Sequence, residues 1–504
     1  MRQPATAHRP SAWAVSHPNA RNAAVGRSAG PNPERAILLS SSEAYAGART
    51  KGYGLFLKVA SILIDGTWRT PEVSDCFVVR SPADREPLGA VARCGAAELD
   101  AAVAAARAAF APWKALGKQR RAGLLAQCAE DLRQRSGALA RIAAQESGEP
   151  YRECLDAMSA VVQRFSNAQE VQVAPGVHGV NIGGRYSLLA LAASVAPLLA
   201  AGSTLVCLVP AAMPLATLAA AQSLSTLPRG VFNILPADAD LEGALFAHAG
   251  IDAALCATPC GARLASERGE PATADFILIA RDADLELAVG GAASLRLFDS
   301  GQRPGQSARI HVEQPLLSAF AERLHQFIAF LECGDPVRPI TDLGPLGTDR
   351  GLREVQTRVG EALRRGVLLK LGGRPYQPWG LTGYFFQPTL MIEAREHQRA
   401  PFEEVAGPVL VLAPAADLGR SLQQCRRTAM PTPACVWLFA ADLPRALDSL
   451  AASGFTARLQ SAPEGPLARL LEKPRAPAPG ELIVRHVDRS LPTGFPYAVR
   501  SGRL

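Results

Sequence analysis

The side chains that could carry out covalent chemistry in this sequence are its cysteines, and their spacing limits that chemistry. The chain has 10 scattered cysteines, with no Cys-x-x-Cys pair and no histidines clustered at metal-ligand spacing. This pattern favours free, buried thiols in a reducing compartment over a disulfide framework or a zinc site. The stretch "DSGQRPGQSARIHV", Asp299–Val312, has the composition of a loop that leads into a strand, but no cysteine lies between Cys260 and Cys333. A thiol nucleophile would have to come from elsewhere in the chain.

Length and composition indicate a globular protein of two or more domains. The chain has 504 residues, of which 48% are hydrophobic and 20% charged, enough to bury a large core. The net charge of +7 is spread along the chain and forms no basic stripe, which argues against nucleic-acid binding. The uncharged run Tyr186–Ala221 is long enough to cross a membrane. Its prolines and glycine instead predict a buried helix, a turn and a buried parallel strand.

The first 55 residues are expected to form a disordered or irregular extension. Residues 1–33 are rich in Arg, Ala, Ser and Pro and contain no acidic residue. Transit peptides share this composition with disordered tails, and we favour the tail. The apolar core of a secretory signal is not found there, so we expect a cytoplasmic protein.

Periodic patterns predict the strands and helices that would position a site. "ILIDGTWRTP" and "FVVRSPADREPLGAV" are typical of short strands joined by turns, with a hairpin turn at Asp65-Gly66. Residues 96–113 predict an amphipathic helix whose apolar stripe is formed by Leu99, Val103, Ala106 and Phe110. A further helical pattern ends at Gly148 and Pro150.

Beyond Val177, helical patterns alternate with short apolar runs such as "TLVCLV", "GVFNIL", "DAALCA", "DFILIA", "RIHVE", "PVLVLAP" and "CVWLFA". This alternation is typical of parallel sheets covered by helices on both faces. We therefore predict an α/β fold with two lobes, residues 56–270 and 271–475, followed by a shortened C-terminal segment, residues 476–504.

These segments, in this order, resemble the aldehyde dehydrogenase superfamily over about residues 62–495. The motifs that carry the resemblance are "LDAAVAAARAAFAPW", "ESGEP", "APLLAAGSTLV", "LPRGVFNIL", "DADLELAV", "SGQ" with "RIHVE", "DLGPL", "GYFFQPTL" and "FEEVAGPVLVL". The resemblance implies a Rossmann-like NAD(P)-binding lobe and an α/β catalytic lobe. It also implies the family reaction, the NAD(P)-dependent oxidation of an aldehyde to a carboxylic acid.

The positions that the resemblance assigns to catalysis are degenerate here. In the family a cysteine thiolate attacks the aldehyde, and an asparagine amide and the backbone N–H of that cysteine stabilise the oxyanion. The nucleophile position, two residues after Gly301-Gln302, is Pro304, which has neither a nucleophilic atom nor an N–H. The asparagine position is Arg185, in "GGRYS". Arg185 could hold an anion of another kind.

The general base and the cofactor positions are altered as well. Counting back from Asp282 places Glu270 at the base, with a solvated loop carboxylate as the alternative interpretation. The resemblance implies NAD or NADP as cofactor, but the residues that would clamp the adenosine ribose are Leu208 and Ala211. The glycine-bearing loop at a helix N-terminus, where the pyrophosphate would bind, has become "CATPCGARL". Glu404, in "EEVAGPV", still matches the glutamate that binds the nicotinamide ribose.

The segments through which family members assemble are predicted to be missing. Only "QRFSNAQEVQVAP" separates the helix after "ESGEP" from "GVHGVNIGGR", which leaves no room for the family's assembly hairpin. The sequence stops after "LPTGFPYAVRSGRL", where the family continues into a tail strand. We predict a monomer, or an assembly made through another surface.

Three hypotheses on function follow. The leading one is a catalytically inactive family member that acts as a scaffold or regulatory partner of another protein, such as an active paralogue. The second is an active NAD(P)-dependent oxidoreductase that acts on aldehydes with a rearranged site. Its nearest thiols in sequence would be Cys256 and Cys260, which we interpret as buried structural cysteines. The third is a protein without a selected function, which the intact core pattern argues against.

Overall fold

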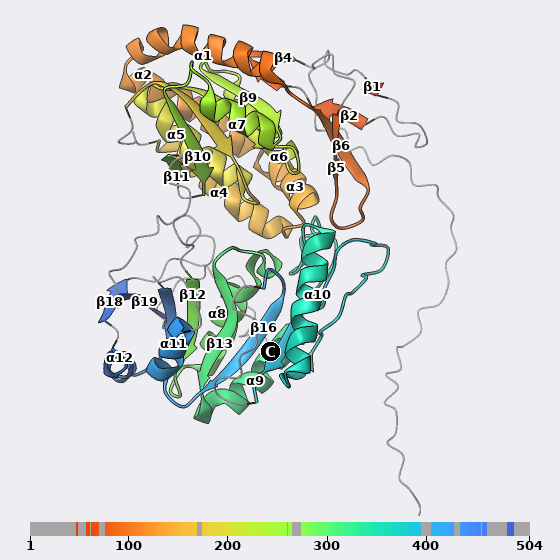
Figure 1. Ribbon diagram of the computed structural model, residues 1–504, viewed down its shortest axis with the longest axis vertical. Coiled ribbons are helices and arrows are strands. Elements are labelled where there is room, and N and C mark those ends of the chain that lie inside the picture. Colours follow the sequence, from red (N-terminus) through yellow and green to blue (C-terminus); the bar gives the residue numbers. More distant parts are fainter. Residues whose placement is uncertain are drawn as a thin grey trace, which may run out of the picture. The chain divides into compact units, whose positions relative to one another are not determined.

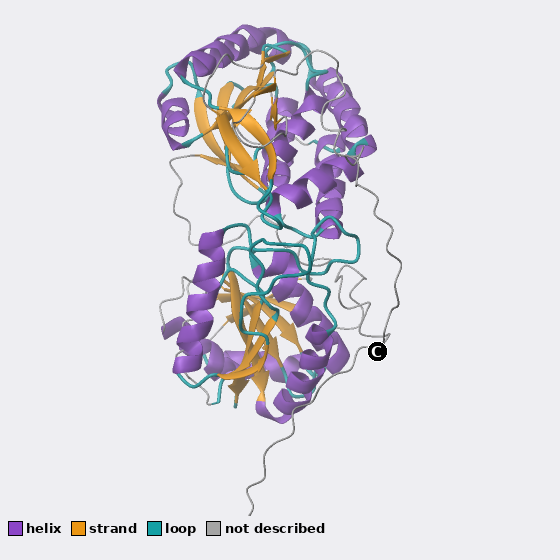
Figure 2. Ribbon diagram, turned by 90° about the vertical axis from the view of Figure 1, so that its right-hand side faces the viewer, coloured by secondary structure: helices purple, strands orange, loops and turns teal. Residues whose placement is uncertain are grey.

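The computed structural model describes residues 47–48, 57–60, 62–69, 76–168, 174–259, 261–264, 274–394, 405–427, 434–454, 456–460 and 481–487. They belong to one compact unit, Glu43–Leu504. Two large β-sheets with helices packed against them dominate this unit, as the predicted α/β fold requires (Figure 1, Figure 2). Within these residues, no helix is long and apolar enough to cross a membrane.

The first large sheet has seven strands in the order β11-β10-β7-β8-β9-β3-β4. Its central strands β10, β7, β8 and β9 are parallel, and antiparallel strands flank them on both sides. The strands are β3 (Ile62–Ile64), β4 (Thr67–Arg69), β7 (Val177–Ile182), β8 (Thr204–Pro210), β9 (Phe232–Ala237), β10 (Ala253–Thr258) and β11 (Gly261–Leu264). The helices of this half are α1 (Ala96–Ala115), α2 (Lys118–Gln134), α3 (Ser136–Ser147), α4 (Tyr151–Ser166), α5 (Ser187–Ala201), α6 (Leu215–Ala221) and α7 (Ala239–Ala247).

Local sequence explains several of these elements. Asp65 and Gly66 have φ angles of 53° and 67°, as a two-residue hairpin turn needs, so the predicted hairpin is confirmed. α3 ends at Gly148, whose φ of 80° allows a left-handed cap. The run Tyr186–Ala221 forms α5, β8 and α6, which confirms the predicted buried helix, turn and buried strand.

The second large sheet has eight strands in the order β14-β15-β16-β13-β12-β17-β19-β18, parallel except for the pair β14 and β15. Alternate residues of β12 face opposite cores. Ile277 and Ile279 pack with α8 and α9, whereas Phe276 and Leu278 pack with α11 and α12. The strands are β12 (Ala274–Ile279), β13 (Gln306–Glu313), β14 (Leu368–Leu371), β15 (Thr389–Ile392), β16 (Val409–Ala415), β17 (Ala434–Phe439), β18 (Thr456–Gln460) and β19 (Glu481–Val487). The helices are α8 (Leu285–Leu297), α9 (Gln314–Ala329), α10 (Asp349–Arg364), α11 (Leu418–Arg427) and α12 (Leu443–Ala452).

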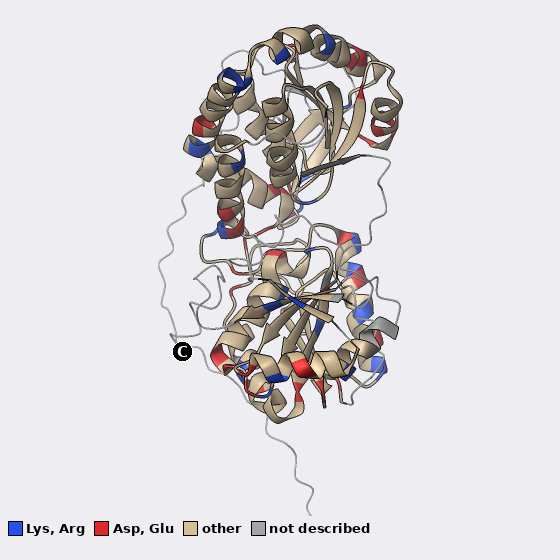
Figure 3. Ribbon diagram, turned by 90° about the vertical axis from the view of Figure 1, so that its left-hand side faces the viewer, with Lys and Arg blue, Asp and Glu red and all other residues tan. Residues whose placement is uncertain are grey.

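A small sheet of β1 (Gly47–Ala48), β2 (Leu57–Ala60), β5 (Cys76–Arg80) and β6 (Pro87–Ala92) completes the fold. β5 and β6 form an antiparallel hairpin, as predicted. In the view of Figure 3, acidic and basic residues alternate along the outer helices, while most strand residues are neither.

Candidate active site

The loop that holds the nucleophile position has an unusual backbone. After α8, the residues Asp299, Ser300 and Gly301 have φ angles of 52°, 52° and 73°, one tight left-handed turn before β13. A left-handed conformation costs a residue other than glycine roughly 1 to 2 kcal/mol. At Gly301 a side chain is excluded, because a Cβ atom would lie 2.2 Å from the carbonyl oxygen of Gly407. Strong contacts must therefore hold Asp299 and Ser300 in this turn.

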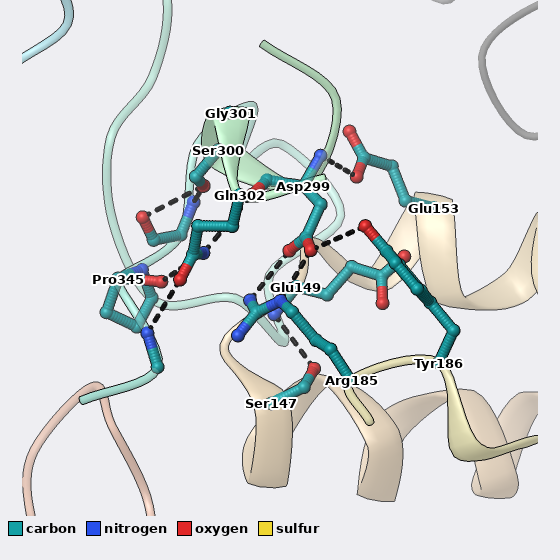
Figure 4. Close-up of polar contacts among 12 residues, drawn as sticks. Ser147, Glu149, Glu153, Arg185, Tyr186, Asp299, Ser300, Gly301, Gln302 and Pro345 are labelled. Carbon is teal, nitrogen blue, oxygen red and sulfur yellow. Dashed lines mark hydrogen bonds and ion pairs between the residues drawn. The ribbon is translucent and has the colours of Figure 1, made fainter. Parts of the chain in front are cut away.

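Two polar side chains tie the turn to residues 344–347 (Figure 4). The Ser300 hydroxyl accepts from the backbone N–H of Gly344 at 2.9 Å and donates to its carbonyl oxygen at 3.1 Å. The Gln302 side chain accepts from the N–H of Gly347 at 2.8 Å and donates to the carbonyl of Pro345 at 3.3 Å. The "SGQ" motif thus fixes the loop through its side chains.

Arg296, at the end of α8, supports the same turn from the other side. Its fully buried guanidinium donates to the carbonyl oxygens of Gly301, Val405 and Gly407 at 2.6 to 2.8 Å. Burial, and then the charge of Arg303, lower the pKa of Arg296 to about 9. A buried cation is costly unless its N–H groups are hydrogen-bonded, and Arg296 donates to three carbonyl oxygens.

The guanidinium of Arg185, the residue predicted at the oxyanion position, is paired with a carboxylate of the protein itself (Figure 4). Its Nε and Nη2 donate to the two carboxylate oxygens of Asp299 at 2.5 and 2.6 Å. The hydroxyl of Tyr186 donates to Asp299 Oδ2 at 2.9 Å. The Asp299 side chain is fully buried and that of Arg185 is 15% exposed. Although burial by itself opposes the charge, Asp299 raises the pKa of Arg185 above its usual value.

Two further buried carboxyl groups surround this ion pair. The backbone N–H of Asp299 donates to Glu153 Oε2 at 2.7 Å. Burial, followed by the charge of Asp299, raises the pKa of Glu149 to about 8. Burial and the charges of Glu149 and Asp299 raise the pKa of Glu153 well above its usual value. Burial and mutual repulsion therefore favour the protonated forms of Glu149 and Glu153 beside the Arg185–Asp299 pair.

A small cavity of about 30 Å³ adjoins the pair and is lined in part by Glu149, Cys154, Arg185 and Tyr186. Cys154 contributes its thiol to the wall of this cavity. The sequence analysis did not single out this residue. Burial, followed by the nearby carboxylates, raises the pKa of Cys154 well above its usual value. A thiol held in its protonated form is a poor nucleophile.

Pro304 differs from the residues of this cluster in its burial. It is exposed, and the preceding residue, Arg303, forms a buried ion pair with Asp275 at 2.7 Å. Cys256 lies half-buried on β10, and Cys260 lies outside the described residues. The described loop between α8 and β13 thus contains no cysteine. Arg185 is the predicted site residue that the structure brings together with Asp299 and Tyr186.

The residues at the cofactor positions do not fit an adenosine ribose. Leu208, on β8, is fully buried in the core between the sheet, α1 and α7, and its side chain has no hydrogen-bonding group. Ala211 follows β8 and is half-buried. Glu270 and Glu404 lie outside the described residues.

The segment "CATPCGARL", predicted to be an altered form of the family's pyrophosphate loop, forms a hairpin in its described residues. The chain turns after β10 and returns as antiparallel β11, with Thr258 paired to Gly261 and Leu255 to Leu264. A hairpin has no row of unpaired N–H groups like the start of a helix, so these residues do not form the anion site that the resemblance places in the family's loop.

Sequence reasoning missed Asp299, Tyr186 and Glu153 as members of the cluster. The sequence offered two signals. Arg185 stands where the resemblance predicts an asparagine, and Asp299, in "DSGQ", lies two residues before the Gly-Gln step. Their separation of 114 residues hid the contact.

Comparisons with known proteins agree on one family. A model described as aldehyde dehydrogenase family matches residues 68–183 and 176–451. The chain is 29% identical over 390 residues to 3-sulfolactaldehyde dehydrogenase of Pseudomonas putida, covering 69% of this chain and 78% of that protein. It is 26% identical over 418 residues to succinate-semialdehyde dehydrogenase (NADP(+)) GabD of Escherichia coli (strain K12), covering 76% and 86%.

Solved structures share the fold. Lactaldehyde dehydrogenase from Escherichia coli superposes with a TM-score of 0.67 at 20% identity, covering 86% of this chain and 92% of that chain. The NAD+ complex of aldehyde dehydrogenase from Bacillus cereus superposes with a TM-score of 0.66 at 22% identity, covering 79% and 87%.

Proposed function

Because the chain belongs to the aldehyde dehydrogenase family, we propose that it keeps the family scaffold without thiol-dependent aldehyde oxidation and acts as a binding or regulatory partner of another protein. The family reaction needs a nucleophile, donors for the oxyanion and a bound dinucleotide. Each of these is altered at the positions named by the resemblance.

The observation that carries the proposal is the ion pair between Arg185 and Asp299. An oxyanion that forms in the site would compete with a carboxylate that is already bound through two hydrogen bonds and buried. Electrostatic catalysis requires donors that are oriented and available before the reaction. Arg185 is oriented, but Asp299 neutralises it.

The nucleophile position supports the same proposal. Pro304 supplies neither a thiol nor an N–H. Removing one oxyanion donor typically lowers the rate about 100-fold to 1000-fold, and the loss of the nucleophile closes the covalent route. The left-handed turn at Asp299 and Ser300 is bonded to residues 153, 185 and 344, so the loop is a fixed structural element.

An active oxidoreductase with a rearranged site is the second candidate. The relatives named as dehydrogenases, at 26 to 29% identity over most of their lengths, favour it. In this case the dinucleotide would have to bind without a ribose clamp at Leu208 and Ala211.

Titration calorimetry of the full-length protein with NAD+, NADP+ and NADH, together with thermal melting, separates the two candidates. We expect no heat of binding. We also expect no rise in melting temperature, because a ligand raises it only by binding the folded state. Binding followed by cofactor reduction with an aldehyde would reject the proposal in favour of the enzyme.

A further inference from the structure

The outer edge of the second sheet exposes apolar side chains to solvent. β14 is the last strand on that side, and no further strand of the described residues pairs with it. Leu368 is 58% exposed and Leu369 is 43% exposed. Because neighbouring residues of a strand point to opposite faces, β14 exposes apolar side chains on both of its faces. Such an edge can pair with another strand, and proteins usually protect it.

The exposed edge continues beyond β14. After Gly372 and Gly373, Pro375 forms a bridge with Phe386, and the N–H of Tyr376 donates to the carbonyl of Phe385 at 3.0 Å. The chain is therefore paired on its inner side as far as Tyr376, whose side chain is also exposed. We call residues 368–376 the β14 edge.

The surroundings of the β14 edge are basic. Residues 362–392 contain no Asp or Glu, and their basic residues, all exposed, are Arg364, Arg365, Lys370 and Arg374. Lys370 contacts Glu322 of α9 at 3.0 Å, with both side chains about half exposed. An exposed pair of this kind contributes little, so a carboxylate of a partner can replace Glu322.

We infer that the β14 edge binds an extended acidic segment of a partner protein, which adds a strand to the second sheet. The outer N–H and C=O groups of the edge would form the main-chain hydrogen bonds. Leu369, on the strand face opposite to Lys370, would contact apolar side chains of the segment. Acidic residues of the segment would meet Lys370 and Arg374. The inference rests on the proposed function, because it names the surface through which a non-catalytic partner would act.

A second copy of this chain is disfavoured as the occupant. Pairing two β14 edges around a two-fold axis would bring Lys370 and Arg374 of both copies together, and like charges on paired strands repel. A lysine on an edge strand also opposes indiscriminate pairing. The charge of the edge therefore selects an acidic strand.

The test uses the full-length protein and a short capped peptide of alternating glutamate and valine, with a lysine–valine peptide as control. We expect the acidic peptide to bind, and the backbone amides of residues 368–376 to be protected from hydrogen exchange in the complex. The double change Lys370→Glu and Arg374→Glu should weaken binding about tenfold or more, because it places like charges opposite one another. Arg350→Glu, an exposed arginine at the start of α10, is the matched control and should keep the affinity within about twofold.

The inference is overturned if the wild-type protein does not bind the acidic peptide, or if Arg350→Glu loses as much affinity as the double variant. Binding to phosphatidylserine vesicles without binding to the peptide would identify an anionic membrane instead. A concentration-dependent dimer with protected β14 amides would identify a second copy. Circular dichroism checks that the variants fold. None of these results bears on catalysis, which the cofactor titration tests separately.

Discussion

The substitution Asp299→Asn tests whether the buried Arg185–Asp299 ion pair stabilises the fold. Asparagine keeps the size of the side chain, one acceptor oxygen and the tolerance for a left-handed backbone at φ 52°. It removes the charge that faces the Arg185 guanidinium. Breaking a buried ion pair on one side typically costs about 3 to 5 kcal/mol, because the remaining charge stays buried without a partner. We expect the free energy of unfolding to fall by that amount, measured from urea denaturation followed by tryptophan fluorescence.

Asp65→Asn is a matched control for this prediction. Asp65 also has a left-handed backbone, with φ 53°, and also pairs with an arginine, Arg229, at 2.6 Å. That pair is exposed, so its loss should cost about 0 to 1 kcal/mol. The double variant Arg185→Met with Asp299→Asn should recover much of the loss, since no unpaired charge remains. Equal destabilisation by Asp299→Asn and Asp65→Asn would refute the interpretation of the Arg185–Asp299 pair as a buried structural contact.

Three further outcomes are expected. Pro304→Cys should restore no substantial aldehyde oxidation in a cofactor-reduction assay, because Arg185 stays neutralised and the ribose clamp is absent; recovery of activity would contradict this. Gly301→Ala should destabilise the protein by more than about 2 kcal/mol or prevent folding, because its Cβ would lie 2.2 Å from the Gly407 carbonyl oxygen. The control Gly184→Ala, at φ +86° with open space around the Cβ, should cost only about 1 to 2 kcal/mol in the same denaturation assay. The raised pKa of Glu149, about 8 against an ordinary 4.5, means that the folded state holds a proton that the unfolded state releases, so stability should fall as the pH rises from about 5 to 8. Glu149→Gln should flatten this dependence in melting curves across that pH range, and an unchanged slope would count against a protonated Glu149.

Local patterns were sufficient to predict most of the elements around the site. The hairpin at Asp65-Gly66, the end of α3 at Gly148 and the buried run that forms α5 and β8 depend on turn geometry and on continuous apolar burial, which neighbouring residues specify. The exposed loop position of Pro304 also follows from local composition. The strand at residues 261–264 was not predicted, and these residues pair back on β10. A segment of four residues, Gly-Ala-Arg-Leu here, is too short for its periodicity to distinguish a strand from a helix, and its neighbour in the sheet decides.

The sequence by itself determined that a proline follows two residues after Gly301-Gln302 and that an arginine stands where the resemblance predicts the oxyanion asparagine. Residue identity alone excludes a thiol and an N–H at Pro304. Only the tertiary structure decided what Arg185 does. Its partner Asp299 is 114 residues away, and the left-handed turn that presents Asp299 is held by Glu153 and Gly344 from other elements. An ion pair between distant residues leaves no periodic trace in a sequence, since its energy depends on burial and geometry that exist only after the chain has folded.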